Sequence, residues 1–240
     1  MNPKLRLVKQ RHRCEHCLFR HFFLSVGLNC DEIDQTGQAT TTNIGPYRPG
    51  EYLYHAGEKC NALYVVHAGT VKTEMVTFDG DLHVSGFYLT GELFGADGIN
   101  KQNFVADAVA VENTWVCELT FDNWEKLAMA YPDLQRLLIS ELGRVIAHKE
   151  LEALSSHYHL LEHRLMSFLT DLLNRIKERR GQQSNEIELA MTKTDIARYL
   201  GATPESISRA LSKLEKSGYI KNTKRKIYIL KDESCLDTAI

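Results

Sequence analysis

Hydrophobic and polar residues alternate over short stretches between about residues 40 and 120, a pattern typical of strands with one buried face. In 70–76, Val71, Thr73 and Met75 fall on one side of an extended chain, with polar residues between them. Glycines interrupt the pattern every few residues, and Asp79-Gly80 is a hairpin signal. Many short strands at regular spacing predict an antiparallel roll or barrel. The six expected strands are 52–55, 63–67, 70–76, 82–87, 105–111 and 114–119.

The pattern becomes helical after about residue 121. Residues 133–156 contain one glycine and no proline, and their leucines and a valine recur at spacings of three and four. A long helix with one apolar stripe requires a partner, either its own domain or a second helix. We expect a parallel two-stranded coil, in which a lysine near the seam would weaken the pairing. The expected seam residues are Leu138, Leu142, Val145 and Lys149.

Residues 191–220, MTKTDIARYLGATPESISRALSKLEKSGYI, predict two helices joined by a tight turn. Thr192 or Thr194 can cap the first helix, and Thr203 can cap the second. Gly201 suits the left-handed backbone conformation that such a turn requires. An ordinary helical hairpin with solvated charges is the alternative interpretation of this segment.

The outward face of the second predicted helix carries groups that read DNA. Its polar residues lie near the helix N-terminus, where a recognition helix meets base edges. Arginine can bind guanine O6 and N7, and glutamate can accept a hydrogen bond from cytosine N4. The basic stretch 221–226, between two short apolar runs, predicts a wing that contacts the phosphate backbone. The residues expected to contact DNA are Thr203, Glu205, Ser208, Arg209, Lys213, Lys224 and Arg225.

Composition and charge limit the class of protein. Of the 240 residues, 43% are hydrophobic and 25% charged, and no apolar run is long enough to cross a membrane. The first ten residues lack the apolar stretch of a signal peptide, so we expect a cytoplasmic protein. Residues 161–240 carry 15 Lys and Arg against 11 Asp and Glu, whereas residues 1–160 carry 14 against 20. A basic part behind an acidic part fits an effector domain joined to a nucleic-acid reader.

The stretch RHRCEHCLFRHFF, residues 11–23, places Cys14 and Cys17 beside three histidines. Because disulfides are rare in the cytosol, the six cysteines of the chain suit metal ligands, reactive thiols or core residues. A thiol oxidoreductase would place a C-x2-C pair at a helix N-terminus in an α/β fold. The chain has no βαβ pattern and no other pairing of a nucleophile with a base, so we expect it not to be an enzyme.

The segment MTKTDIARYLGATPESISRAL, with the E-x-x-S-R pattern of Glu205, Ser208 and Arg209, resembles the helix-turn-helix of the CRP/FNR family, and its FNR branch in particular. The resemblance implies an α+β fold with an N-terminal antiparallel β-roll of the cyclic-nucleotide-binding type, a long dimerisation helix and a C-terminal winged helix-turn-helix. It implies a homodimer that acts on double-stranded DNA, at a near-palindrome resembling TTGAT-N4-ATCAA, and on RNA polymerase as a transcription activator. The expected domains are a cysteine-bearing segment at 1–31, the roll at 32–132, the dimerisation helix at 133–160 and the DNA-binding domain at 161–240.

The resemblance also raises a cyclic nucleotide as a candidate ligand of the roll. Members that bind one use a Gly-Glu followed by an Arg-Ser/Thr pair at the phosphate. Gly91-Glu92 is present here, but no arginine occurs between Arg48 and Arg136. We therefore expect no cyclic nucleotide.

FNR-type sensors hold an oxygen-labile 4Fe-4S cluster on three N-terminal cysteines and one cysteine of the roll. Cys117, in WVCEL, matches the roll ligand, and Cys14 and Cys17 match two of the others. Phe23 stands at the third position and Cys30 lies seven residues later, so the spacing is C-x2-C-x12-C instead of C-x2-C-x5-C. A remodelled loop would bring Cys30 in at little entropic cost. We expect the ligands Cys14, Cys17, Cys30 and Cys117, in a dimer whose pairing weakens in oxygen; a thiol switch, a zinc site with the histidines, and no cofactor are the alternatives.

Overall fold

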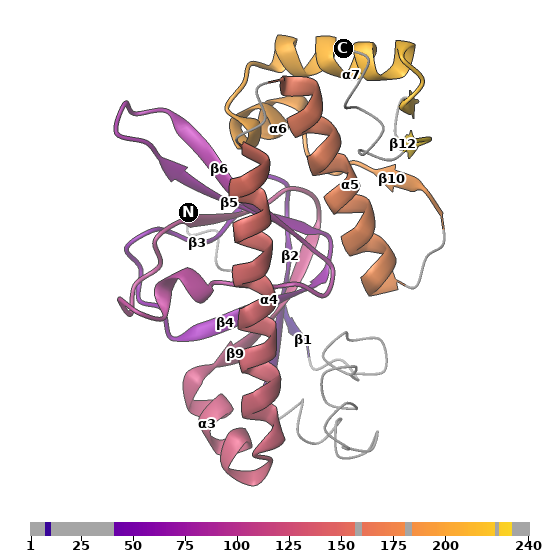
Figure 1. The fold of residues 1–240 in the computed structure, drawn as a ribbon. Coiled ribbons are helices and arrows are strands. Elements are labelled where there is room, and N and C mark those ends of the chain that lie inside the picture. Colours follow the sequence, from indigo (N-terminus) through magenta and orange to yellow (C-terminus); the bar gives the residue numbers. More distant parts are fainter. Residues whose placement is uncertain (1–7, 11–40, 157–159, 181–183, 224–225, 232–240) are drawn as a thin grey trace. The chain divides into compact units, whose positions relative to one another are not determined.

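The structure is a computed structural model that divides into two compact units. The first consists of the chain up to Met75 together with Ser85–Ala147, and the second of Val76–Val84 together with the chain from His148. The first unit is built mainly of strands and the second mainly of helices (Figure 1). The residues that the structure describes are 8–10, 41–156, 160–180, 184–223 and 226–231.

The first unit is a roll of two antiparallel sheets. The five-stranded sheet has the order β1-β2-β9-β4-β7, and the four-stranded sheet has the order β3-β8-β5-β6. Each of the six predicted runs overlaps one of these strands, which confirms the predicted roll. The strands are β1 (Val8–Gln10), β2 (Thr41–Tyr47), β3 (Tyr52–Tyr54), β4 (Ala62–Ala68), β5 (Thr70–Val76), β6 (Leu82–Leu89), β7 (Leu93–Phe94), β8 (Asp107–Ala110) and β9 (Thr114–Thr120).

The hairpin predicted at Asp79-Gly80 joins β5 to β6. The amide of Thr77 donates to the carbonyl of Asp81 at 2.8 Å, and Gly80 has a φ of 86°. Glycine tolerates this left-handed conformation without the steric cost that a side chain would bring. The glycine that predicted the turn is therefore required by the backbone conformation there.

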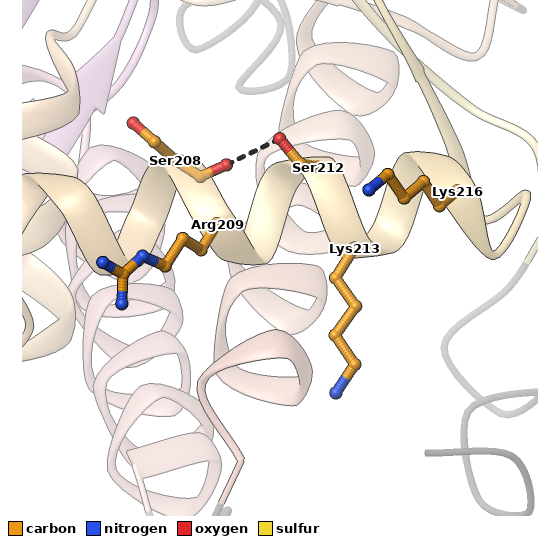
Figure 2. Close-up of a pocket in the computed structure, with 5 residues that line it drawn as sticks. All are labelled: Ser208, Arg209, Ser212, Lys213 and Lys216. Carbon is orange, nitrogen blue, oxygen red and sulfur yellow. Dashed lines mark hydrogen bonds between the residues drawn. The ribbon is translucent and has the colours of Figure 1, made fainter.

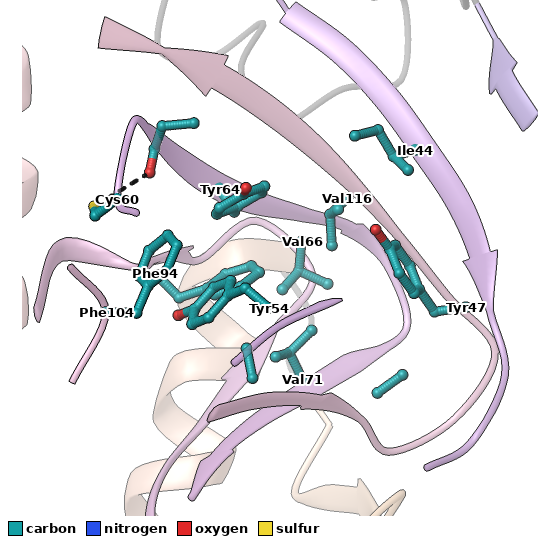
Figure 3. Close-up of a cluster of buried hydrophobic side chains, with 13 residues drawn as sticks. Ile44, Tyr47, Tyr54, Cys60, Tyr64, Val66, Val71, Phe94, Phe104 and Val116 are labelled. Carbon is teal, nitrogen blue, oxygen red and sulfur yellow. Dashed lines mark hydrogen bonds between the residues drawn. The ribbon is translucent and has the colours of Figure 1, made fainter. Parts of the chain in front are cut away.

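Side chains of the five-stranded sheet alternate between two apolar clusters. Val116 on β9 lies in the cluster between the two sheets, which Figure 3 shows, and its neighbour Cys117 lies in the cluster on the opposite face. Tyr64 and Val65 of β4 divide in the same way. The sheet is thus covered on both faces, by the second sheet on one side and by helices on the other.

Two helices follow the roll, α3 (Phe121–Ala130) and α4 (Asp133–Ser156). Leu134, at the start of α4, is fully buried in the cluster that contains Cys117. Leu138 and Leu142 pack half-buried against the same cluster, so these two predicted seam residues face the roll of their own chain. The large apolar side chains that α4 exposes are Ile139, Ile146, Leu151 and Leu154.

Besides the last turns of α4, the second unit contains three helices and a small sheet among its described residues, arranged as a winged helix-turn-helix. Strand β12 lies between β10 and β11, antiparallel to both. In the described part of the chain, no helix combines the length and apolar character that a membrane span would need. The elements are α5 (Leu161–Arg180), β10 (Glu186–Glu188), α6 (Lys193–Leu200), α7 (Pro204–Lys216), β11 (Ile220–Asn222) and β12 (Lys226–Ile229).

Candidate nucleic-acid interface and sensor residues

The two helices predicted in 191–220 begin at capping threonines. Thr192 caps α6 in a reciprocal capping box, because its hydroxyl accepts from the amide of Asp195 at 3.1 Å and its own amide donates to the Asp195 carboxylate at 3.1 Å. Gly201 ends α6 with a φ of 62°. Thr203 caps α7 by accepting from the amide of Ser206 at 3.2 Å. These bonds fix the turn and confirm Thr203 as the predicted cap of α7, whereas its contact with DNA stays a prediction.

Helix α7 presents one polar face to solvent and one apolar face to the unit. Ile207 and Leu214 are buried, whereas Glu205 and Arg209 are exposed. An open groove runs along the exposed face, and Figure 2 shows Arg209 and Lys213 extending from the same side of the helix. The groove is lined by Ser208, Arg209, Ser212, Lys213 and Lys216. The polar residues predicted in this helix thus share an accessible face.

Three of these side chains are engaged within the chain. The Ser208 hydroxyl donates to the carbonyl of Pro204 at 3.0 Å, and the Lys193 ammonium donates to Ser208 at 3.1 Å. The Lys213 ammonium lies 3.2 Å from the Glu162 carboxylate. Ser212 donates to the carbonyl of Ser208 at 3.0 Å. Contacts of Ser208 or Lys213 with DNA would replace these bonds, whereas Arg209 extends into the groove.

The basic wing lies between β11 and β12. Its predicted contacts Lys224 and Arg225 lie outside the described residues. The residues on either side form a turn, because the amide of Thr223 donates to the carbonyl of Lys226 at 2.8 Å. The Lys226 ammonium lies 2.5 Å from the Glu186 carboxylate of β10. This ion pair ties the wing to the sheet.

Cys117 lies in a row of directly paired residues that crosses the five-stranded sheet. Gln10 of β1 is opposite Asn43 of β2, and Asn43 is opposite Cys117 of β9. Cys117 is in turn opposite Val65 of β4. Directly paired residues point to the same face of a sheet, so the side chains of Asn43 and Val65 share the face of the Cys117 cluster. The row joins Cys117 to the strand that precedes the N-terminal cysteines.

Among the described residues, Cys117 lies in an apolar cluster and is paired with Asn43 on the neighbouring strand. Cys117 is 5% exposed and Asn43 is 7% exposed. Among the described residues, the Asn43 Oδ1 atom has no hydrogen-bond partner. Cys14, Cys17 and Cys30 lie outside the described residues.

Two family profiles match the chain along most of its length. The "Cyclic nucleotide-binding domain" profile matches residues 45–131, and the "Crp-like helix-turn-helix domain" profile matches residues 163–237. Electron transport regulator A of Shewanella oneidensis is 33% identical to this chain over 91% of it and 86% of that protein. The chain belongs to the CRP/FNR family of transcription regulators.

Other relatives place this CRP/FNR regulator near the FNR branch. The fumarate and nitrate reduction regulatory protein of Escherichia coli is 31% identical to it, over 92% of this chain and 90% of that protein. The transcriptional activator protein Anr of Pseudomonas aeruginosa is 28% identical, over 95% and 92%. The solved structure of FixK2 from Bradyrhizobium japonicum superposes with a TM-score of 0.70 at 27% identity, covering 84% of this chain and 98% of that one.

The family membership confirms three of our predictions. The fold is that of CRP/FNR regulators, the protein is a DNA-binding transcription regulator, and its relatives are regulators and not enzymes. Sequence reasoning missed Ser212, which lines the groove, and Lys193, which contacts Ser208. Ser212 had a signal, because it follows Ser208 by four residues and therefore shares its face. Lys193 had none, because its contact with Ser208 depends on how α6 crosses α7.

Proposed function

We propose that this CRP/FNR regulator is switched by oxygen or redox state through a 4Fe-4S cluster held by Cys14, Cys17, Cys30 and Cys117. The row of paired residues from Gln10 to Cys117 carries this proposal. Adjacent strands lie about 4.8 Å apart, so Gln10 is about 10 Å from Cys117. Cys14 follows four residues later, and four extended residues reach about 13 Å. The pairing of β1 therefore places the start of the cysteine segment close enough for Cys14 to reach Cys117.

The two described cysteines differ in what they offer a cluster. Cys60 lies in the cluster between the sheets, where its thiol is 3.6 Å from the carbonyl of Gly95. Burial raises the pKa of the Cys60 thiol, which opposes formation of the thiolate that a metal requires. Cys117 lies on the opposite face, in the row that leads to Gln10. This arrangement favours Cys30 over Cys60 as the third cysteine of the N-terminal group.

Four thiolates match the donor set of a 4Fe-4S cluster, which supplies oxygen-labile redox chemistry when bound. Cys117 would anchor the cysteine segment to the roll, and the apolar residues around it would limit access of water. Asn43, directly beside Cys117, offers amide hydrogens to a sulfur ligand and an acceptor to the segment. The chain's own contribution is thus to hold the N-terminal segment against β9.

We propose that the roll binds no cyclic nucleotide. Its inner cluster is filled by aromatic side chains, with Tyr54 stacked on Phe104 at 3.7 Å between ring centroids and Tyr64 5.5 Å from Phe94 (Figure 3). The chain also lacks the arginine that the phosphate would need, between Arg48 and Arg136. The signal we propose for this roll is therefore the cluster.

We infer that the regulator acts as a homodimer paired along α4, on a near-palindrome resembling TTGAT-N4-ATCAA, and that it activates RNA polymerase. Leu138 and Leu142, which we predicted at the seam, pack against the roll of their own chain. We therefore place the exposed residues Ile139, Ile146 and Leu154 at the contact between the two α4 helices. Ile139 and Ile146 are seven residues apart, which repeats one helix face. Val145 and Lys149 are half-buried, and Lys149 is 2.6 Å from the Glu152 carboxylate.

Replacing Arg209 by Ala is expected to weaken binding to the palindrome by about 1–3 kcal/mol, roughly 5- to 150-fold per half-site contact, and to relax preference for guanine at one position. Arg209 is exposed on the groove of α7 and extends toward solvent. Fluorescence anisotropy with single-base variants of the palindrome measures both effects. Lys216→Ala serves as the control, because a phosphate contact would weaken all sequences equally. Unchanged sequence preference in Arg209→Ala would contradict a base-reading role.

The cluster is tested by purifying the protein without oxygen and measuring absorption, iron and sulfide. The proposal expects about four irons and four sulfides per chain, with a broad band near 400 nm that bleaches in air. A colourless, iron-free protein that still binds the palindrome would contradict the cluster and leave DNA binding intact. Zinc and thiol assays would then separate the two remaining metal and redox alternatives.

A further inference from the structure

The C-terminal end of α4 belongs to the same compact unit as the helix-turn-helix. The first unit includes α4 up to Ala147, and the second begins at His148. The Glu152 carboxylate, on the last turns of α4, collects donors from two directions. The Lys149 ammonium lies 2.6 Å from one of its oxygens, and the Tyr199 hydroxyl of α6 donates to the other. Glu152 thereby joins α4 directly to the first helix of the DNA-binding motif.

Tyr199 is suited to this bond. Its ring packs against the ring of Phe168 on α5, with 5.2 Å between the centroids, while its hydroxyl bonds to Glu152. Burial, and then the negative charge of Glu152, raise the pKa of the Tyr199 hydroxyl. The hydroxyl therefore keeps its proton and donates a hydrogen bond to the carboxylate. The Glu152 side chain is only 18% exposed, so water competes weakly for the bond.

A second set of bonds ties the same turns of α4 to α5. His148 Nε2 lies 3.0 Å from the Asp171 carboxylate, and Arg175 lies 3.1 Å from the same oxygen. Burial raises the pKa of Asp171, but the bond from His148 and the charge of Arg175 outweigh it and the net shift is downward. His148 Nδ1 also lies 3.5 Å from Glu152. The two sets thus form one network across α4, α5 and α6.

We propose that Glu152 is a positioning residue: its bond with Tyr199 fixes the helix-turn-helix on the end of α4 and so sets the spacing of the two recognition helices in the dimer. This inference rests on the proposed dimer. Two half-sites of a palindrome lie about one helical turn of DNA apart, so the recognition helices must be held at that separation. A loosened attachment leaves each recognition helix intact but lets the pair lose its match to the DNA.

The mechanism predicts a selective loss. Tyr199→Phe removes one hydroxyl and keeps the ring on Phe168. In the full-length protein we expect affinity for the full palindrome to fall about 5- to 30-fold, and affinity for a single half-site to change less than about twofold. Glu152→Gln is expected to act in the same direction. Fluorescence anisotropy measures both affinities, below the melting temperature of each variant, and sedimentation equilibrium verifies that dimerisation is unchanged.

Tyr64→Phe is the matched control, because it removes a tyrosine–glutamate bond, to Glu118 at 3.3 Å, from the first unit. It is expected to leave the ratio of the two affinities unchanged. Equal losses on full site and half-site in Tyr199→Phe and Glu152→Gln, or no loss on either, would overturn the positioning role. A wild-type protein that does not prefer the full site would instead overturn the proposed dimer, and this inference with it.

Discussion

Replacing Cys117 by Ser is expected to remove the iron and sulfide of the anaerobically purified protein, from about four of each per chain to near zero. Cys117 is the roll's contribution to the proposed cluster, and serine cannot supply the thiolate. The exchange adds no volume to the buried site on β9 but introduces a hydroxyl there, so a stability loss of about 1–3 kcal/mol is expected. Metal analysis and the band near 400 nm measure the loss, and thermal unfolding verifies that the protein is folded.

Cys60→Ser is the control for Cys117→Ser, because both thiols are buried but they lie in different clusters. It should keep the full iron content. Cys30→Ser should lose iron as Cys117→Ser does, since Phe23 occupies the usual place of that ligand. Full iron content in Cys117→Ser would contradict the proposed ligand set. Loss of iron in Cys60→Ser but not in Cys30→Ser would identify Cys60 as the third ligand.

The strands of the roll were predictable wherever alternation and turn residues coincided. Residues 70–76 show a period of two and follow directly after Gly69, and they became a strand. β2 was missed because its TTNIGPY contains a glycine and a proline, which normally argue against a strand. β7 has two residues and is too short for any periodic signal. β2 is a strand because it pairs with β9, and β7 because it pairs with β4. Such pairing between distant segments cannot be seen in the local sequence.

The bounds of α4 were predictable from the sequence, but the face of α4 that packs on the roll was not. The sequence placed α4 at 133–156, which the structure reproduces. Its apolar residues occupy two faces, one with Leu138 and Leu142 and another with Ile139 and Ile146. Periodicity alone cannot decide which face packs on the chain's own roll, because both repeat at three and four. Contact with the cluster around Leu134 decides it.

The recognition helix was predictable because caps, turn and polar face all lie within one short segment. The network around Glu152 was not, since Glu152 and Tyr199 are separated by 46 intervening residues and neither belongs to a local motif. The reach from Gln10 to Cys117 was equally hidden, because it depends on the register of β1, β2 and β9. The sequence indicated cysteine ligands, and the register of the sheet supports the proposal that the N-terminal cysteines can reach Cys117.

Replacing Ile146 by Glu is expected to abolish stable dimers and to weaken binding to the palindrome by more than about 100-fold. Ile146 is 60% exposed on α4 and lies seven residues after Ile139, which is 69% exposed. In the paired helices these side chains would meet across the seam, where two facing carboxylates would be buried without partners. A monomer holds only one half-site and loses the gain in effective concentration that the second provides. Sedimentation equilibrium and fluorescence anisotropy measure the two effects.

Met129→Glu, on α3, is the matched control, because it places the same charge at a side chain that is 84% exposed. It should leave both the dimer and the DNA affinity unchanged. Leu142→Glu addresses the other face of α4: it should destabilise the roll, because Leu142 packs on the Leu134 cluster. If instead Leu142→Glu separated the dimer while Ile146→Glu did not, the seam would follow the leucines, and the exposed isoleucines would need another partner.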